Sequence, residues 1–122
     1  MIDILPFLAK QLRPVCPTQT QFPDVRASFP VVTLCELGNS ADTVLDGEER
    51  LCGVDIQIDV WDNAKTAAKC KQLAAEVSTV MTRLGFRRYF GNEMPDPAVP
   101  QRYSMRFQGV IDEHTGMVYW NN

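Results

Sequence analysis

The sequence has little of what most reaction centres require. Only one histidine occurs in 122 residues, and the four cysteines lie far apart with no C-x-x-C pair. A zinc site needs several such ligands at close spacing, so we expect no metal and interpret the cysteines as buried free thiols. Neither G-x-G-x-x-G nor G-x-x-x-x-G-K-[ST] is present, which excludes nucleotide binding by those routes.

An excess of positive charge is also missing. Twelve Lys and Arg against fifteen Asp and Glu give a formal net charge of −3, whereas a dedicated nucleic-acid-binding domain usually carries a basic excess. No apolar run approaches the roughly 20 residues of a membrane-spanning helix. The first residues lack the pattern of a secretory signal. These absences indicate a protein that is made and kept in a cytoplasm.

What the sequence does contain is typical of one compact domain. Its 122 residues, 45% of them hydrophobic and 22% charged, predict a single domain over residues 1–122. The charge is distributed unevenly. Residues 1–62 hold four basic and ten acidic side chains, and residues 63–122 hold eight and five. Besides ordinary surface scatter, this asymmetry is compatible with copies that dock head to tail.

Hydrophobic periodicity predicts the order of the elements. The clearest pattern is the alternation of Val54, Ile56, Ile58 and Val60 with polar residues, which predicts a strand with one core face. The predicted elements are a short helix ending by Pro14, a strand at 31–37, a polar loop at 38–50, a strand at 51–62, a long helix at about 64–84, and strands at 86–90, 102–111 and 117–120.

This order predicts an α+β fold, a mainly antiparallel β-sheet with one long helix packed across a face and a short N-terminal helix. Asp62 or Asn63 is the expected cap of the long helix, and Gly85 its C-terminal stop. The last two strands are expected to form an antiparallel hairpin through Gly116.

The polar clusters each have a simple structural interpretation. Asp55, Asp59 and Asp62 could hold a hard cation, but alternation places the first two on the solvent side of a strand, where solvation accounts for them. The carboxylates of the loop at 38–50 lack the spacing of an EF-hand. His114 follows Asp112 with no nucleophile signalled nearby, so we interpret it as a turn residue.

Basic and aromatic residues form a cluster at 83–90: Arg83, Arg87, Arg88, Tyr89 and Phe90. Its arginines could contact phosphate or single-stranded nucleic acid, but the acidic total favours a helix end or a protein interface. With no reaction centre and no cofactor expected, the sequence indicates an assembly subunit rather than an enzyme. The predicted interface residues come from the loop, the exposed strand face and this cluster: Asp42, Asp46, Glu48, Glu49, Arg50, Asp55, Gln57, Asp59, Arg87 and Arg88.

Four segments together carry a family resemblance. They are the strand Pro30–Leu34, the strand Val54–Trp61 ending in Val-Trp, the Ala-rich helix through Met81, and the strand Tyr103–Phe107. In this order, over roughly residues 1–120, they resemble tail terminator, or tail completion, proteins of long-tailed bacteriophages. The similarity lies in the order of elements and the placement of apolar residues.

The resemblance implies a structural virion protein at the head-proximal end of the tail. It would form a hexameric ring that caps the tube of major tail tube protein, stops its polymerisation and offers a docking face for head-tail connector proteins. DNA would pass through the opening without specific contact. Two alternatives stay open: a head-to-tail connector (neck) protein, and a small cytoplasmic enzyme or ligand-binding domain.

Overall fold

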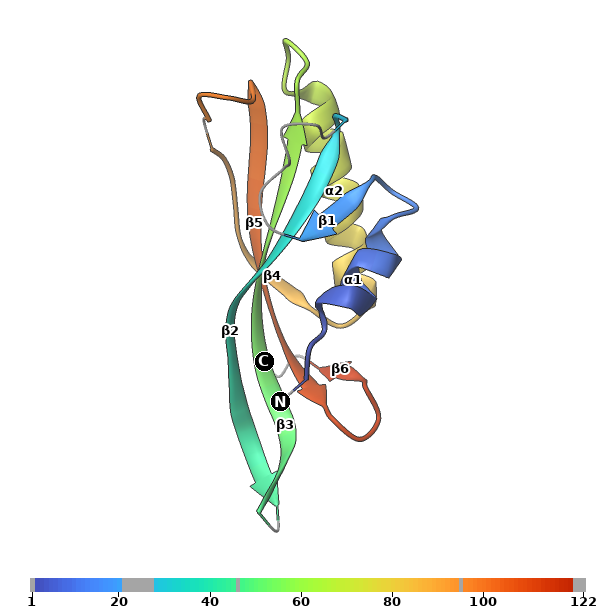
Figure 1. The fold of residues 1–122 in the computed structure, drawn as a ribbon, viewed down its shortest axis with the longest axis vertical. Coiled ribbons are helices and arrows are strands. Elements are labelled where there is room, and N and C mark those ends of the chain that lie inside the picture. Colours follow the sequence, from blue (N-terminus) through green and yellow to red (C-terminus); the bar gives the residue numbers. More distant parts are fainter. Residues whose placement is uncertain (1, 21–27, 46, 95, 120–122) are drawn as a thin grey trace.

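The computed structural model describes residues 2–20, 28–45, 47–94 and 96–119. Within them the chain forms one six-stranded sheet of order β1-β2-β3-β5-β4, with β6 paired to β5 (Figure 1). The β1–β2 pair is parallel, and the other pairs are antiparallel. The elements are α1 (Leu5–Leu12), β1 (Thr18–Thr20), β2 (Val31–Leu45), β3 (Glu48–Asp62), α2 (Ala68–Arg83), β4 (Arg87–Glu93), β5 (Gln101–Asp112) and β6 (Val118–Tyr119).

The predicted α+β fold with one long helix across a face is wrong. The described chain is mostly β-sheet, and both helices are short, with 8 residues in α1 and 16 in α2. The second helix begins at Ala68 because the expected cap does not act as one. The Asp62 carboxylate accepts a hydrogen bond from the backbone N–H of Asn63, and no side chain caps α2.

The prediction of a loop at 38–50 is also wrong. This segment forms β-strand and accounts for most of the strand that the sequence did not predict. β2 and β3 each have 15 residues and pair from Val31↔Trp61 to Leu45↔Glu48. Gly47 lies at the tip with a φ of 76°, a conformation that favours glycine. The distal part of this hairpin extends past both helices (Figure 1). A ribbon outside the core has no buried face, so its sequence needs no apolar alternation.

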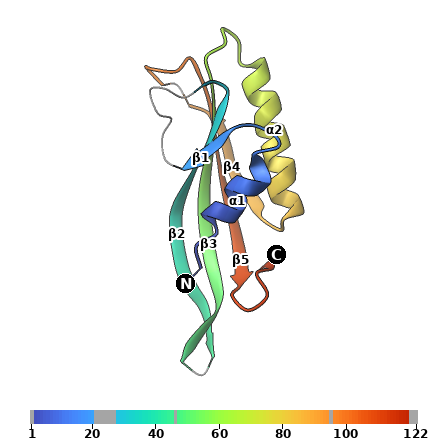
Figure 2. The same cartoon turned by 45° about the vertical axis from the view of Figure 1, so that its right-hand side comes forward.

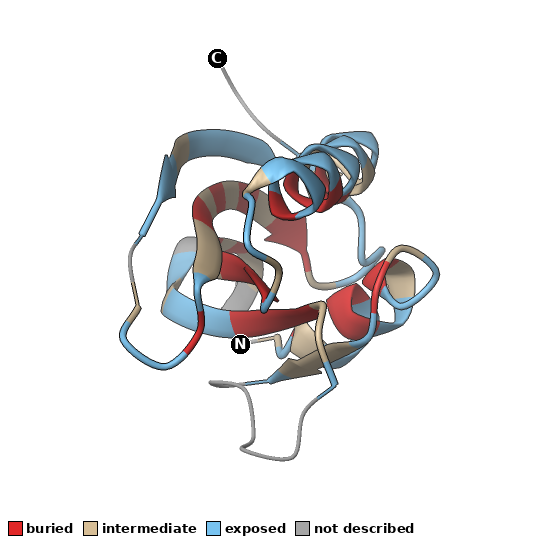
Figure 3. Ribbon diagram, turned by 90° about the horizontal axis from the view of Figure 1, so that it is seen from above, coloured by how far each residue is buried: buried red, intermediate tan, exposed pale blue. Residues whose placement is uncertain are grey.

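Both helices lie on the same side of the sheet (Figures 1 and 2). α1 contacts β1 and β2, and α2 contacts β3, β4 and β5. The buried residues of the helices turn towards the sheet, as Figure 3 shows from above. The apolar stripe of α2 meets the alternating residues of β3 and β5 in one core: Cys70, Leu73, Ala74, Val77, Met81, Val54, Ile56, Ile58, Val60, Met105 and Phe107.

A smaller apolar cluster lies apart from this core. Val31, Trp61 and Val99 are buried together, with Phe29 packed against them. Val31 and Trp61 are Cα partners at the end of the β2–β3 pair. The segment after Asp96 thus helps to cover one end of the sheet.

The predicted C-terminal hairpin is confirmed by the β5–β6 pair Val110↔Tyr119 and Ile111↔Val118. The hairpin packs closely at Gly109, where an added Cβ would lie 2.7 Å from Val118 Cγ1 and 2.8 Å from Phe86 Cδ1. Glycine at this position therefore allows Phe86 and β6 to approach β5.

Candidate functional site

A polar network covers the face of the sheet opposite the helices. Asp59 on β3 is only 4% exposed, and its Oδ1 lies 3.2 Å from Nε of Arg102 on β5. Gln57 Nε2 donates a hydrogen bond of 3.0 Å to Asp59 Oδ2. From its place in the strand, the sequence predicts that Asp59 is solvated. The neighbouring strand instead covers this carboxylate with an arginine.

The same arginine links the network to the smaller apolar cluster. The Arg102 guanidinium lies 4.5 Å from the ring centroid of Trp61, whose indole N–H donates to Thr33 Oγ1 at 2.9 Å. A carboxylate, a guanidinium and an indole are therefore held in one arrangement across β2, β3 and β5. Buried contacts of this kind are costly to break, so we assign Asp59, Arg102 and Trp61 a structural role.

Further along this face, β4 contributes aromatic side chains. The Tyr89 hydroxyl donates to Asp55 Oδ1 at 2.5 Å, and burial together with this carboxylate raises the pKa of Tyr89 to about 12. Arg106 lies 5.1 Å from the ring centroid of Phe90. Asp55 and Gln57, two of the predicted interface residues, are thus half-buried within a network of cross-strand contacts.

The predicted residues of the hairpin fall into two groups. Asp46 and the side chains of Asp42, Glu48 and Glu49 lie outside the described part of the structure. Arg50 is described, and it lies on β3 two residues after Glu48, near the tip of the hairpin and beside the β5–β6 turn.

Arg50 joins that turn to β3. Its Nε lies 3.3 Å from Asp112 Oδ1, and its Nη1 lies 2.9 Å from Nδ1 of the exposed His114. The Asp112 carboxylate also accepts the backbone N–H of His114, and this hydrogen bond and the nearby Arg50 charge hold its pKa below the ordinary value. His114 is a turn residue, as predicted.

Arg87 and Arg88 are both exposed on β4 and project to opposite sides of the sheet. Arg87 is the Cα partner of Gln108, whereas Arg88 is the partner of the core residue Phe107 and lies on the helix side. The two predicted residues therefore belong to different surfaces.

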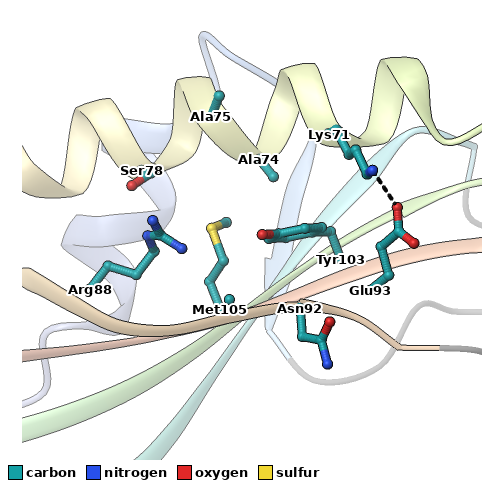
Figure 4. A pocket seen from close by; sticks show the side chains of 10 residues that line it. Lys71, Ala74, Ala75, Ser78, Arg88, Asn92, Glu93, Tyr103 and Met105 are labelled. Atoms are coloured by element: carbon teal, nitrogen blue, oxygen red, sulfur yellow. Dashed lines mark ion pairs between the residues drawn. The ribbon is translucent and has the colours of Figure 1, made fainter.

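Arg88 lies in a groove of about 610 Å³ between α2 and β4 (Figure 4). The floor of the groove is Met105, and the small residues Ala74, Ala75 and Ser78 form the helix wall. The Lys71–Glu93 ion pair, 2.8 Å from Nζ to Oε1, joins α2 to β4 at one end. Among the residues that the structure describes, no carboxylate pairs with Arg88.

A second groove of about 740 Å³ lies between α1 and the β1–β2 pair. Asp3 and Glu36 place carboxylates along it, and Arg13 is the one cation among its lining residues. The two grooves lie on the same face of the sheet, at its opposite edges, because β4 and β1 are its outermost strands. Sequence patterns gave no sign of this groove, since β1 has only three residues and no alternation.

The cysteines differ in accessibility. None of the four forms a disulfide. Cys16, Cys52 and Cys70 are buried as predicted, but the prediction of a buried thiol is wrong at Cys35, which is exposed. Burial raises the pKa of Cys16 and of Cys70 to about 11. Within the described ranges no group of three or more His, Cys, Asp or Glu side chains could hold a metal ion, and no described helix is long and apolar enough to cross a membrane.

Comparison with known proteins gives one match of interest. No protein-family model matches the chain, and neither does any curated protein. Among the solved structures that match is that of the bacteriophage SPP1 gp17 protein, at 15% sequence identity and a TM-score of 0.48, covering 93% of this chain and 91% of that chain. The chain is similar to this bacteriophage protein in the layout of its elements.

Proposed function

We propose that the chain is a structural virion protein of the tail-terminator class. Copies assemble into a closed ring, six-membered as the sequence resemblance implies, at the head-proximal end of a phage tail. The ring caps the tube of major tail tube protein, ends its polymerisation and presents a docking face to head-tail connector proteins. The protein performs no catalysis in this role.

The observation that carries the proposal is the long β2–β3 hairpin. The core residues of this pair stop at Cys52 and Val54, yet the strands continue to the Leu45↔Glu48 pair. Val44, near the tip, is 56% exposed. Exposed strand of this length adds nothing to the core of its own subunit, and projecting elements are typical of proteins that bind a neighbour.

The segments that carry the resemblance support the same role. Pro30–Leu34, Val54–Trp61 and Tyr103–Phe107 lie on β2, β3 and β5, which are adjacent in the sheet, and the Ala-rich segment is α2. They form the body of the subunit, from which the hairpin projects.

The charge of the chain suits a ring through which DNA passes. Each copy carries a formal net charge of −3, so a ring is acidic as a whole and repels the phosphate backbone. DNA that passes such an opening makes few lasting contacts.

The test is to mix the purified protein with polymerising tail-tube protein and to examine the tubes by negative-stain electron microscopy. We expect shorter tubes, each with a density cap at one end, and no further growth when more tube protein is added. Tubes that keep growing without caps contradict the proposal. Binding to connector proteins without any effect on tubes assigns the chain to the neck instead.

A further inference from the structure

The described sheet ends in two edges with no neighbouring strand. Among the described strands β4 pairs only with β5, so no strand lies on its outer side. On the other side, β1 pairs only with Val32–Leu34, and β2 continues past it. We call residues 87–93 the β4 edge and residues 35–41 the β2 edge. Each edge presents unpaired backbone N–H and C=O groups that can bind another strand.

Both edges carry exposed side chains on their two faces. Cys35, Glu36 and Leu37 are consecutive and all exposed, and so are Arg87, Arg88 and Tyr89. Successive side chains of a strand project to opposite faces, so solvent reaches both faces at these residues. The exposed residues include large apolar side chains, Leu37 at 45% and Tyr89 at 42% exposure.

The charges at the two edges are opposite. Glu36 and Asp3 place carboxylates beside the β2 edge, in the groove under α1. The β4 edge carries Arg87, Arg88 and Glu93; Glu93 is paired with Lys71 of α2, and Arg83 is exposed at the nearby end of α2. Like charges oppose the pairing of two identical edges, whereas a β2 edge and a β4 edge attract each other.

We propose that the β4 edge of one copy of this chain pairs with the β2 edge of the next copy, so that the sheet continues from subunit to subunit. Arg88 of the first copy then faces Glu36 and Asp3 of the second. Side chains of the incoming β2 edge enter the groove over Met105, between α2 and β4. The contact is head to tail, and such a contact closes into a ring when its rotation allows.

This inference rests on the proposed function for the closed ring, and it adds which surfaces meet. It leaves the tip of the hairpin outside the subunit contact, because the β2 edge ends at Ala41. The tip is then available to the tail tube.

Cysteine cross-linking tests the pairing directly. Cys35 is the exposed native thiol on the β2 edge, so a second thiol on the β4 edge gives each chain two linking positions. We expect Arg87→Cys or Asn92→Cys, which share with Cys35 the face opposite the helices, to produce under mild oxidation a ladder of covalent trimers and longer chains on non-reducing gels. Testing both positions covers either relative direction of the strands.

Glu76→Cys is the matched control, since it places an exposed thiol on α2 away from both edges. It should give no ladder, and adding Cys35→Ser to Arg87→Cys should leave dimers at most. A ladder no stronger in the β4 variants than in the Glu76→Cys control overturns the pairing.

Charge reversal gives a second, independent readout. Arg88→Glu should weaken self-association at least tenfold, and Glu36→Arg in the same chain should restore most of it. Lys65→Glu makes the same charge change at an exposed site away from the edges and should have no effect. Reversal without loss of association, or loss without rescue, contradicts the proposed contact.

The outcomes separate this inference from the proposed function. Rings that cap tubes but form no cross-link ladder overturn the edge pairing and leave the function standing. A ladder from a protein that does not cap tubes supports the pairing and contradicts the function. A protein that stays monomeric both alone and with tail tubes, and forms no ladder in either case, contradicts both.

Discussion

Single residues on the face opposite the helices stabilise the fold through contacts between strands. Asp59 and Arg102 are both largely buried, with 5% and 14% of their side chains exposed. The Lys71–Glu93 pair has similar geometry, but its side chains are 57% and 53% exposed. Removing one partner of a buried pair leaves a charge without compensation, whereas an exposed pair contributes little.

We therefore predict that Arg102→Ala lowers the free energy of unfolding by about 3 kcal/mol. Lys71→Ala, the matched control, should lower it by less than about 1 kcal/mol. Urea unfolding followed by circular dichroism measures both. Equal losses in the free energy of unfolding would show that burial does not make the Asp59–Arg102 pair more important for stability than the Lys71–Glu93 pair.

Close packing at Gly109 leads to a second prediction. Gly109→Ala should destabilise the protein by about 1–3 kcal/mol, since its methyl group overlaps Phe86 and Val118. Gly53→Ala is the control, because its Cβ would meet Ser40 Oγ at an ordinary 3.7 Å. Thermal unfolding compares them, and a Gly109→Ala variant as stable as Gly53→Ala contradicts the close approach.

The depressed pKa of Asp112 predicts a pH dependence. A carboxyl whose pKa is lowered by folding adds stability above its unfolded pKa, and loses it as the pH falls through the folded value. Asp112→Asn should thus be less stable than wild type at neutral pH, and the difference should shrink below about pH 4. A difference that stays constant to pH 2 contradicts this assignment.

At the scale of elements, sequence patterns predicted what the core requires. The alternation in β3 and the apolar stripe of α2 identified both because each has one buried face. The hairpin beyond Gly38 was missed, since residues such as Ser40, Ala41 and Val44 are exposed and carry no periodic signal. β1 has three residues and a parallel partner distant in sequence, which no local pattern reveals.

The candidate surfaces depend on register, which local patterns do not give. The sequence placed Asp55, Gln57 and Asp59 on one face of β3, but their covering by Tyr89 and Arg102 follows from the pairing of β3, β5 and β4. Arg88 was selected for its charge. Its place in a groove beside an open edge became visible only with the topology.

The hairpin tip gives a prediction for a whole element. Replacing Leu45–Glu48 with Asn-Gly should leave the Val44↔Glu49 pair and ring assembly intact, because a two-residue turn fits this position. The variant should fail to cap tail tubes, which electron microscopy of growing tubes measures. Normal tail lengths with this variant would remove the tip from the tube contact.

For the whole molecule, a small chain combines a single core with a projecting hairpin, two open edges and opposite charges at those edges. The hairpin and the two edges lack contacts within one subunit. In a closed ring each edge pairs with an edge of a neighbouring copy, so no further copy can add. In the proposed ring the hairpin tips lie outside the subunit contacts.

The central claim is that this chain forms a closed ring that ends a tail tube, and the solution mass tests it most directly. Light scattering over a range of protein concentrations, alone and with polymerised tail-tube protein, gives that mass. We predict a discrete hexamer, or a monomer that assembles only on tube ends. A monomer at every concentration that ignores tubes, or an open series of ever larger species, contradicts the claim.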